Sequence, residues 1–126
     1  VDWVNPKHLD VTQQFFINLL QNWVNDWESL DVERYLSHYD ESAFFSDPAD
    51  FADWASQKRS VNSAKTEIDV ELSNISLFAY PGEQDMIVAE FTQSYESNNF
   101  ESEEEKRQYW KRNDRGEWRI TYEGLR

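Results

Sequence analysis

The stretch "TEIDVELSNISL", residues 66–77, marks the point at which the hydrophobic period of the chain changes. Every second residue in its first half is apolar or β-branched, and these residues are Thr66, Ile68, Val70 and Leu72. This alternation is typical of a β-strand with one buried face. Ser73-Asn74 interrupts it, because Ile75 and Leu77 fall on the opposite parity, and a β-bulge is the simplest cause. The stretch therefore predicts a bulged strand.

Upstream of this stretch the apolar residues recur at helical spacing. A first helix is predicted over 11–29, with Asp10 and Gln13 as a capping box at its start. Asp31 fits the N-cap of a short second helix, and Asp50 that of a third. The apolar faces of the first two helices carry Phe16, Leu19, Leu20, Trp23 and Trp27, and Val32, Tyr35, Leu36 and Tyr39.

Downstream, the alternation continues through three more predicted strands. The inward face of the second strand carries Ile87, Ala89, Phe91, Gln93 and Tyr95. The inward face of the third carries Lys106, Gln108 and Trp110, and the acidic run 101–105 is predicted to loop out or to begin an exposed edge. After a hairpin turn at 113–116, Trp118, Ile120 and Tyr122 alternate.

Helices followed by antiparallel strands predict an α+β domain, with three N-terminal helices packed on one face of a strongly curved sheet. The 126 residues fit one domain over 1–126, with 1–9 as a linker or mobile arm. Because the chain begins at Val1 and shows no signal peptide, we expect an excised domain or a mature fragment.

Composition excludes several classes of partner and chemistry. Twelve Lys and Arg against 25 Asp and Glu give a net charge of −13, which argues against nucleic acid or an anionic membrane surface as the main partner. No apolar run approaches the roughly 18 residues that a membrane helix needs, so no membrane insertion is predicted. The absence of cysteine excludes disulfides and thiolate chemistry within this chain.

Several short segments together suggest a family. They are Trp23, Trp27, Asp31, Tyr35, Leu36 and Tyr39, then "DWASQKR" (53–59), "AEFTQSYES" (89–97), Lys106 and "GEWRI" (116–120). With the order of elements from Val11 to Glu123, they resemble the nuclear transport factor 2-like superfamily, the cone-shaped fold shared with ketosteroid isomerase and scytalone dehydratase. Within it, the chain looks most similar to the C-terminal domain attached to bacterial L,D-transpeptidase-type peptidoglycan enzymes.

This resemblance implies a periplasmic accessory domain, whose enzyme would carry its nucleophilic cysteine in an upstream catalytic domain of the same polypeptide. It implies no cofactor. Members of the superfamily often form a homodimer through the outer face of the sheet. Here the residues assigned to that face are Glu90, Glu96, Arg119 and Glu123, with Met86, Val88 and Tyr109 among them, so dimerisation is left open.

A cone fold places the third helix at the open end of its cavity. Lys58 continues the helical stripe of Phe51, Trp54 and Ala55, so an ammonium group is aimed along a face that is otherwise apolar. We predict a cavity that binds an anionic small molecule, such as a peptidoglycan fragment, a phosphate or an acidic sugar. Its predicted lining is Lys58, Lys106, Gln93, Tyr95, Gln108, Trp54, Tyr39 and Trp118. The alternative is that Lys58 extends to water over Trp54.

No acid–base pair stands out, so no catalytic residue is predicted. The carboxylates nearest the cone mouth are Asp47 and Asp53. No carboxylate of the last three predicted strands is assigned to their inward face. His8 and His38 lack neighbours at metal-ligand spacing, so no metal site is predicted, although a His38–Asp40 pair is conceivable. The alternatives to a binding domain are a free-standing small-molecule isomerase or dehydratase and a structural dimerisation module.

Overall fold

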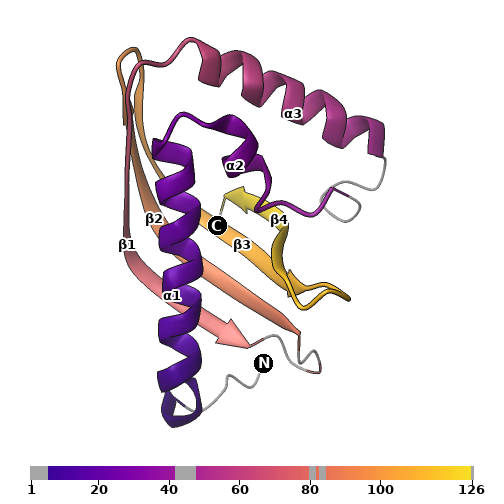
Figure 1. Ribbon diagram of the computed structural model, residues 1–126. Helices are drawn as coiled ribbons and strands as arrows, with labels where there is room; N and C mark the ends of the chain where they lie inside the picture. Colours follow the sequence, from indigo (N-terminus) through magenta and orange to yellow (C-terminus); the bar gives the residue numbers. More distant parts are fainter. Residues whose placement is uncertain (1–5, 42–47, 80–81, 83–84, 126) are drawn as a thin grey trace.

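The computed structural model describes residues 6–41, 48–79, 82 and 85–125, with side chains of the first helix from Gln13 onward. Within these ranges the elements are α1 (Pro6–Glu28), α2 (Val32–Leu36), α3 (Pro48–Ser63), β1 (Ile68–Ala79), β2 (Met86–Ser97), β3 (Glu101–Arg112) and β4 (Trp118–Leu125). The strands form one antiparallel sheet in the order β1-β2-β3-β4, which curves around the helices (Figure 1). The predicted α+β architecture is confirmed.

The helix starts differ from the prediction because proline begins two of them. α1 begins at Pro6, so the predicted start at 11 is wrong, and Asp10 lies inside the helix rather than at a capping box. Residues 6–9 of the predicted arm are therefore helical. α3 begins at Pro48, which places Asp50 in the first turn instead of at the N-cap. Proline suits a first helical position because its fixed φ matches the helix and its missing N–H has no partner there.

The N-cap of α2 is confirmed. The side chain of Asp31 accepts a hydrogen bond from the backbone N–H of Arg34 at 3.4 Å. Leu30 just before it adopts a positive φ of 67°, which lets the chain reverse direction between α1 and α2.

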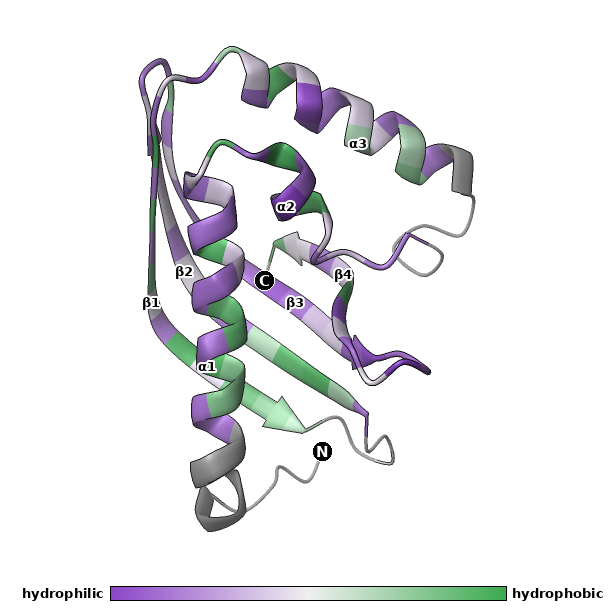
Figure 2. Ribbon diagram, in the orientation of Figure 1, coloured by the Kyte–Doolittle hydropathy of each residue, from purple (hydrophilic) through white to green (hydrophobic). Residues whose placement is uncertain are grey.

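The core lies between the helices and the concave face of the sheet. Trp23 of α1 is 1% exposed, and its ring centroid lies 6.0 Å from that of Phe91 on β2. Apolar and polar residues alternate along α1 in Figure 2, because one stripe of the helix faces the sheet and the other faces solvent. The inward residues predicted for β2 are all buried.

Each edge strand carries one irregularity. In β1 the register shifts between Ser73 and Ser76, and Asn74 has a φ of 53°, which confirms the predicted bulge. In β4 a second shift separates Ile120, paired with Trp110, from Tyr122, paired with Tyr109, so that one extra residue lies between them.

This second bulge overturns two assignments. Tyr122 leaves the inward parity of Ile120 and is 46% exposed. Glu123, which we had placed on the outer face, instead lies opposite the fully buried Gln108 on the concave side. The acidic run 101–105 does not loop out: it pairs with β2, while β4 pairs with β3 only from Lys106 onward. The run is thus an exposed edge, the second of the two predicted options.

The bulge in β1 gives a test of the fold. An alanine at position 74 would have to adopt a left-handed conformation, which asparagine tolerates through local hydrogen bonds of its side chain and alanine does not. Asn74→Ala should lower the free energy of unfolding by about 1 kcal/mol, whereas the control Asn74→Gly should be close to neutral. Urea denaturation measures both changes, and equal destabilisation by the two variants would contradict the role of the backbone at this bulge.

Candidate functional site

A cavity of about 440 Å³ lies between α2, α3 and the concave side of β2 and β3, beside the β2–β3 hairpin. Its polar lining consists of Lys58, Asn62, Lys65, Gln93, Asn99, Ser102, Glu104 and Lys106. Its apolar lining consists of Trp27, Val32, Tyr35, Val61, Ile68, Tyr95 and Phe100. Aromatic walls with a small number of polar groups are typical of small-molecule sites.

Four predicted residues meet in this cavity, and they are Lys58, Lys106, Gln93 and Tyr95. Helical spacing brings Lys58 to it, and strand parity brings the other three. Gln93 is 5% exposed and Tyr95 is 9% exposed, so β2 changes from apolar to polar side chains without leaving the interior.

The other four predicted residues do not line the cavity. Gln108 and Tyr39 are buried behind it, and Trp54 reaches it only through Lys58, whose Nζ lies 5.6 Å from the centroid of the Trp54 ring. Trp118 of β4 pairs with Arg112 at the far end of β3, and its ring packs edge-on against Phe16 at a centroid distance of 4.7 Å. The alternation of residues predicts the face of the sheet on which a side chain lies, but not the end of the strand to which it belongs.

Lys58 carries a partly buried positive charge in the cavity without an ion-pair partner among the described residues. No carboxylate of a described residue lies within the 4.0 Å of an ion pair with its ammonium group. Burial lowers the pKa of Lys58, the nearby carboxylates of Glu123 and Glu104 partly offset that effect, and the positive charge of Lys106 adds to it. The Lys58 ammonium group lies over the Trp54 ring, yet the residue is partly buried and lines the cavity, so it does not simply extend into water as in the alternative.

Sequence reasoning missed two charged groups in the lining. Glu104 lies 3.4 Å from Lys106 Nζ, and it shares the parity of Lys106 on β3, which should have revealed it. Lys65 lies in the connection between α3 and β1, two residues beyond the end of the helix, and its Nζ donates to Ser97 Oγ at 3.1 Å and to Asn99 Oδ1. The statement that no carboxylate faces inward was therefore wrong.

A hydrogen-bonded network supports the cavity from behind. Glu123 Oε1 accepts from Gln108 Nε2 at 2.6 Å and lies 3.0 Å from the hydroxyl of Tyr39. Trp110 Nε1 donates to Gln108 Oε1, and Trp23 Nε1 donates to the Tyr39 hydroxyl. Burial raises the pKa of Tyr39 well above its usual value, so the phenol keeps its proton. Removing one member would leave a buried polar group unpaired.

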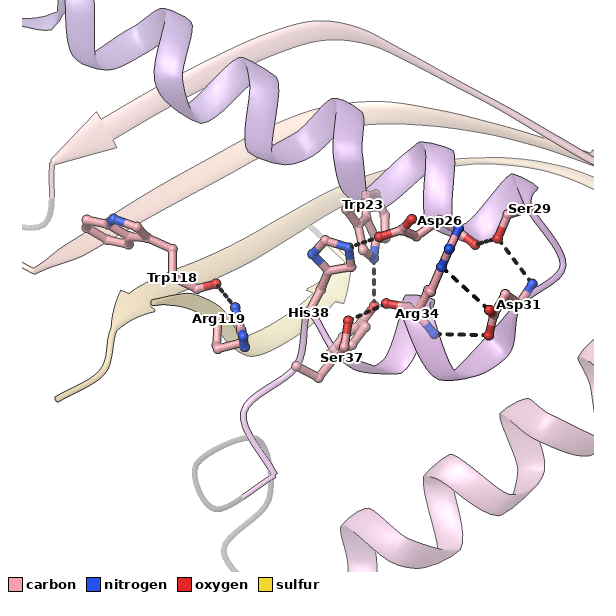
Figure 3. A network of polar contacts seen from close by, with 10 residues as sticks. Trp23, Asp26, Ser29, Asp31, Arg34, Ser37, His38, Trp118 and Arg119 are labelled. Carbon is pink, nitrogen blue, oxygen red and sulfur yellow. Dashed lines mark hydrogen bonds and ion pairs between the residues drawn. The ribbon is translucent and has the colours of Figure 1, made fainter. Parts of the chain in front are cut away.

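A second polar network, shown in Figure 3, is structural. His38 Nε2 lies 2.7 Å from Asp26 Oδ2 on α1, so the structure places Asp26 beside the ring where the sequence had offered Asp40. The Asp40 N–H instead donates to the Ile120 carbonyl. Among the described residues, no three His, Cys, Asp or Glu side chains form a group that could hold a metal ion. Asp53 is exposed, and Asp47 lies outside the described residues.

With this geometry in view, the family can be established. A profile of the Cds6 C-terminal NTF2-like domain matches residues 15–124. The chain belongs to this family. The predicted nuclear transport factor 2-like fold is thereby confirmed. No curated protein matches the chain in sequence. None of the described helices is long and apolar enough to cross a membrane.

Solved structures share the NTF2-like fold of this chain. Bd1075 from Bdellovibrio bacteriovorus is 25% identical with a TM-score of 0.79, over 99% of this chain and 44% of Bd1075. The helical cell shape determining protein Pgp2 from Campylobacter jejuni is 31% identical with a TM-score of 0.69, over 83% of this chain and 38% of Pgp2. The chain thus spans less than half the length of either protein. A candidate dehydratase of the NTF2-like family from Streptomyces avermitilis also shares the fold. It is 15% identical with a TM-score of 0.66, over 92% of this chain and 94% of that protein.

The lowered pKa of Lys58 gives a test of the site geometry. NMR titration of the Lys58 side chain should show deprotonation at lower pH than for an exposed lysine. Glu123→Gln should lower this pKa further, because it removes a favourable negative charge, and Lys106→Met should raise it. Shifts in the same direction in both variants would contradict the arrangement.

Proposed function

We propose that this domain is the noncatalytic ligand-binding part of a periplasmic cell-wall enzyme of the L,D-transpeptidase type. Its cavity takes an anionic ligand, and a peptidoglycan fragment is the candidate. The observation that carries the proposal is the position of Lys58, whose ammonium group faces the cavity without a carboxylate of a described residue at ion-pair distance.

The electrostatics of the cavity support an anion. The chain carries a net charge of −13, yet Lys58, Lys65 and Lys106 gather around one open cavity. Charges in a partly buried cavity interact more strongly than surface charges, because water screens them less. A ligand carboxylate between Lys58 and Lys106 would relieve the repulsion that these two cations exert on each other.

The relatives support the cell-wall setting. Pgp2 is named as a determinant of helical cell shape, and both Pgp2 and Bd1075 are more than twice as long as the part that this chain covers. Their remaining length leaves room for the upstream catalytic domain expected from the resemblance. In such an arrangement, the cavity would hold the enzyme to its polymeric substrate.

One observation favours an isomerase or dehydratase as the second candidate. Glu123 on the concave side is fixed by Gln108 and Tyr39, as a general base would be oriented by donors. An activity assay distinguishes the two functions. Turnover of a small carbonyl or hydroxyl substrate by the purified chain would favour the enzyme over the binding domain, provided that Glu123→Gln abolishes it.

The binding proposal predicts a specific loss of affinity. Lys58→Met keeps most of the stem and removes the charge, so folding should stay intact while affinity for a muropeptide with free carboxylates falls. The expected loss is roughly 1–3 kcal/mol, or about 5- to 150-fold in Kd, the scale of a hydrogen bond to a charged group. Isothermal titration calorimetry measures it.

The matched control is Lys111→Met, which removes an exposed charge from the same acidic protein without touching the cavity. It should leave the Kd nearly unchanged. Equal losses in the two variants would mean that net charge, rather than the cavity, attracts the muropeptide.

Binding should also depend on pH. An anion binds the protonated form of Lys58, so affinity should be complete below the lowered pKa of the free protein and should fall as the pH rises through it. Calorimetry in buffers of different ionisation heat should show proton uptake on binding in that pH range. Lys58→Met should reduce the uptake, and unchanged uptake would assign it to another group.

A further inference from the structure

Charges of both signs lie along one strand of the cavity. Ser102, Glu104 and Lys106 face the concave side of β3, and residues two apart on a strand are about 7 Å apart. The side chain of Glu104 is 43% exposed and that of Lys106 is 19% exposed. The carboxylate therefore lies nearer the opening, and the ammonium group of Lys106, with that of Lys58, lies deeper.

Gln93 adds a carboxamide beside this row. It lies directly opposite Glu104 in the β2–β3 register and is 5% exposed. No side-chain hydrogen bond joins it to another described residue, and its amide atoms keep contact with the cavity. An amide whose donor and acceptor open onto the cavity is suited to a peptide bond of a ligand.

We infer that the cavity recognises an α-amino-acid centre, in which a carboxylate and an ammonium group share one carbon, followed by an amide. The inference rests on the proposed binding function and narrows its ligand from any anion to an amphoteric peptide. The ligand carboxylate lies between Lys58 and Lys106, its ammonium group meets Glu104, and its amide meets Gln93.

The arrangement discriminates through repulsion as well as attraction. A ligand that brings only negative charge draws Lys106 away from Glu104 and leaves that carboxylate facing another anion. A purely anionic ligand would therefore bind less tightly, because it leaves the Glu104 carboxylate without a positively charged partner. An ammonium group two bonds from the ligand carboxylate gives Glu104 a new partner while Lys106 turns to the carboxylate.

Two synthetic peptides test the inference by NMR titration of the 126-residue chain. γ-Glutamylalanine and glutarylalanine share both carboxylates and the amide, and they differ only in the ammonium group on the α-carbon. We expect γ-glutamylalanine to bind about tenfold tighter or more, although glutarylalanine carries the larger negative charge. A site that read negative charge alone would give the opposite order.

Variants separate the inference from the function on which it rests. Glu104→Gln should abolish the preference for γ-glutamylalanine, and Lys58→Met should weaken both peptides. The control Glu103→Gln changes the adjacent residue, which is exposed and does not line the cavity, and should preserve the preference. Equal or tighter binding of glutarylalanine to the unmodified chain would overturn the inference and leave the anion site standing. Absence of cavity shifts with either peptide would overturn both.

Discussion

The curvature of the sheet is the constraint on which the rest of the structure depends, and the two edge strands impose it. The central pair β2–β3 runs without a register shift, whereas β1 and β4 each contain one. A bulge bends its strand and increases the local twist, so bulges at both edges close the sheet around α1 and α2. The shift in β4 also turns Ile120 and Glu123 to the same side, and this places an acceptor beside Gln108 and Tyr39.

The cavity shows how a strongly acidic chain maintains a cationic interior. Most carboxylates lie on exposed positions, where solvent screens them. Three cations instead line the cavity on the concave side, and they are Lys58 of α3, Lys65 of the α3–β1 connection and Lys106 of β3. The rings of Trp54 and Tyr95 lie beneath the ammonium groups of Lys58 and Lys65. Cation–π contact lets an ammonium group remain charged at a partly buried position without a carboxylate in direct contact.

The sequence predicted those features that follow from an uninterrupted helical or strand periodicity of the side chains. Strand parity placed Gln93 and Tyr95, and the helical stripe placed Lys58. It failed where the chain departs from a period: the β4 bulge was hidden because Trp118, Ile120 and Tyr122 read as a regular alternation. It also failed where composition and parity disagree: the acidic run 101–105 predicts a solvated segment, whereas the parity that Glu104 shares with Lys106 places its side chain in the cavity lining. Finally, parity assigns a face but not a position along the strand, which is why Trp118 was placed with Lys58.

The segment that follows α2 has a consequence for self-association. Ile120 donates its N–H to the His38 carbonyl and accepts from the Asp40 N–H, so the outer edge of β4 is already paired at this point. A strand from another molecule cannot extend the sheet there without first displacing residues 38–40, which the His38–Asp26 contact ties to α1. Pairing between the edge strands of two molecules is a usual route to fibrous aggregation of β-proteins. At this edge the protein's own chain blocks it.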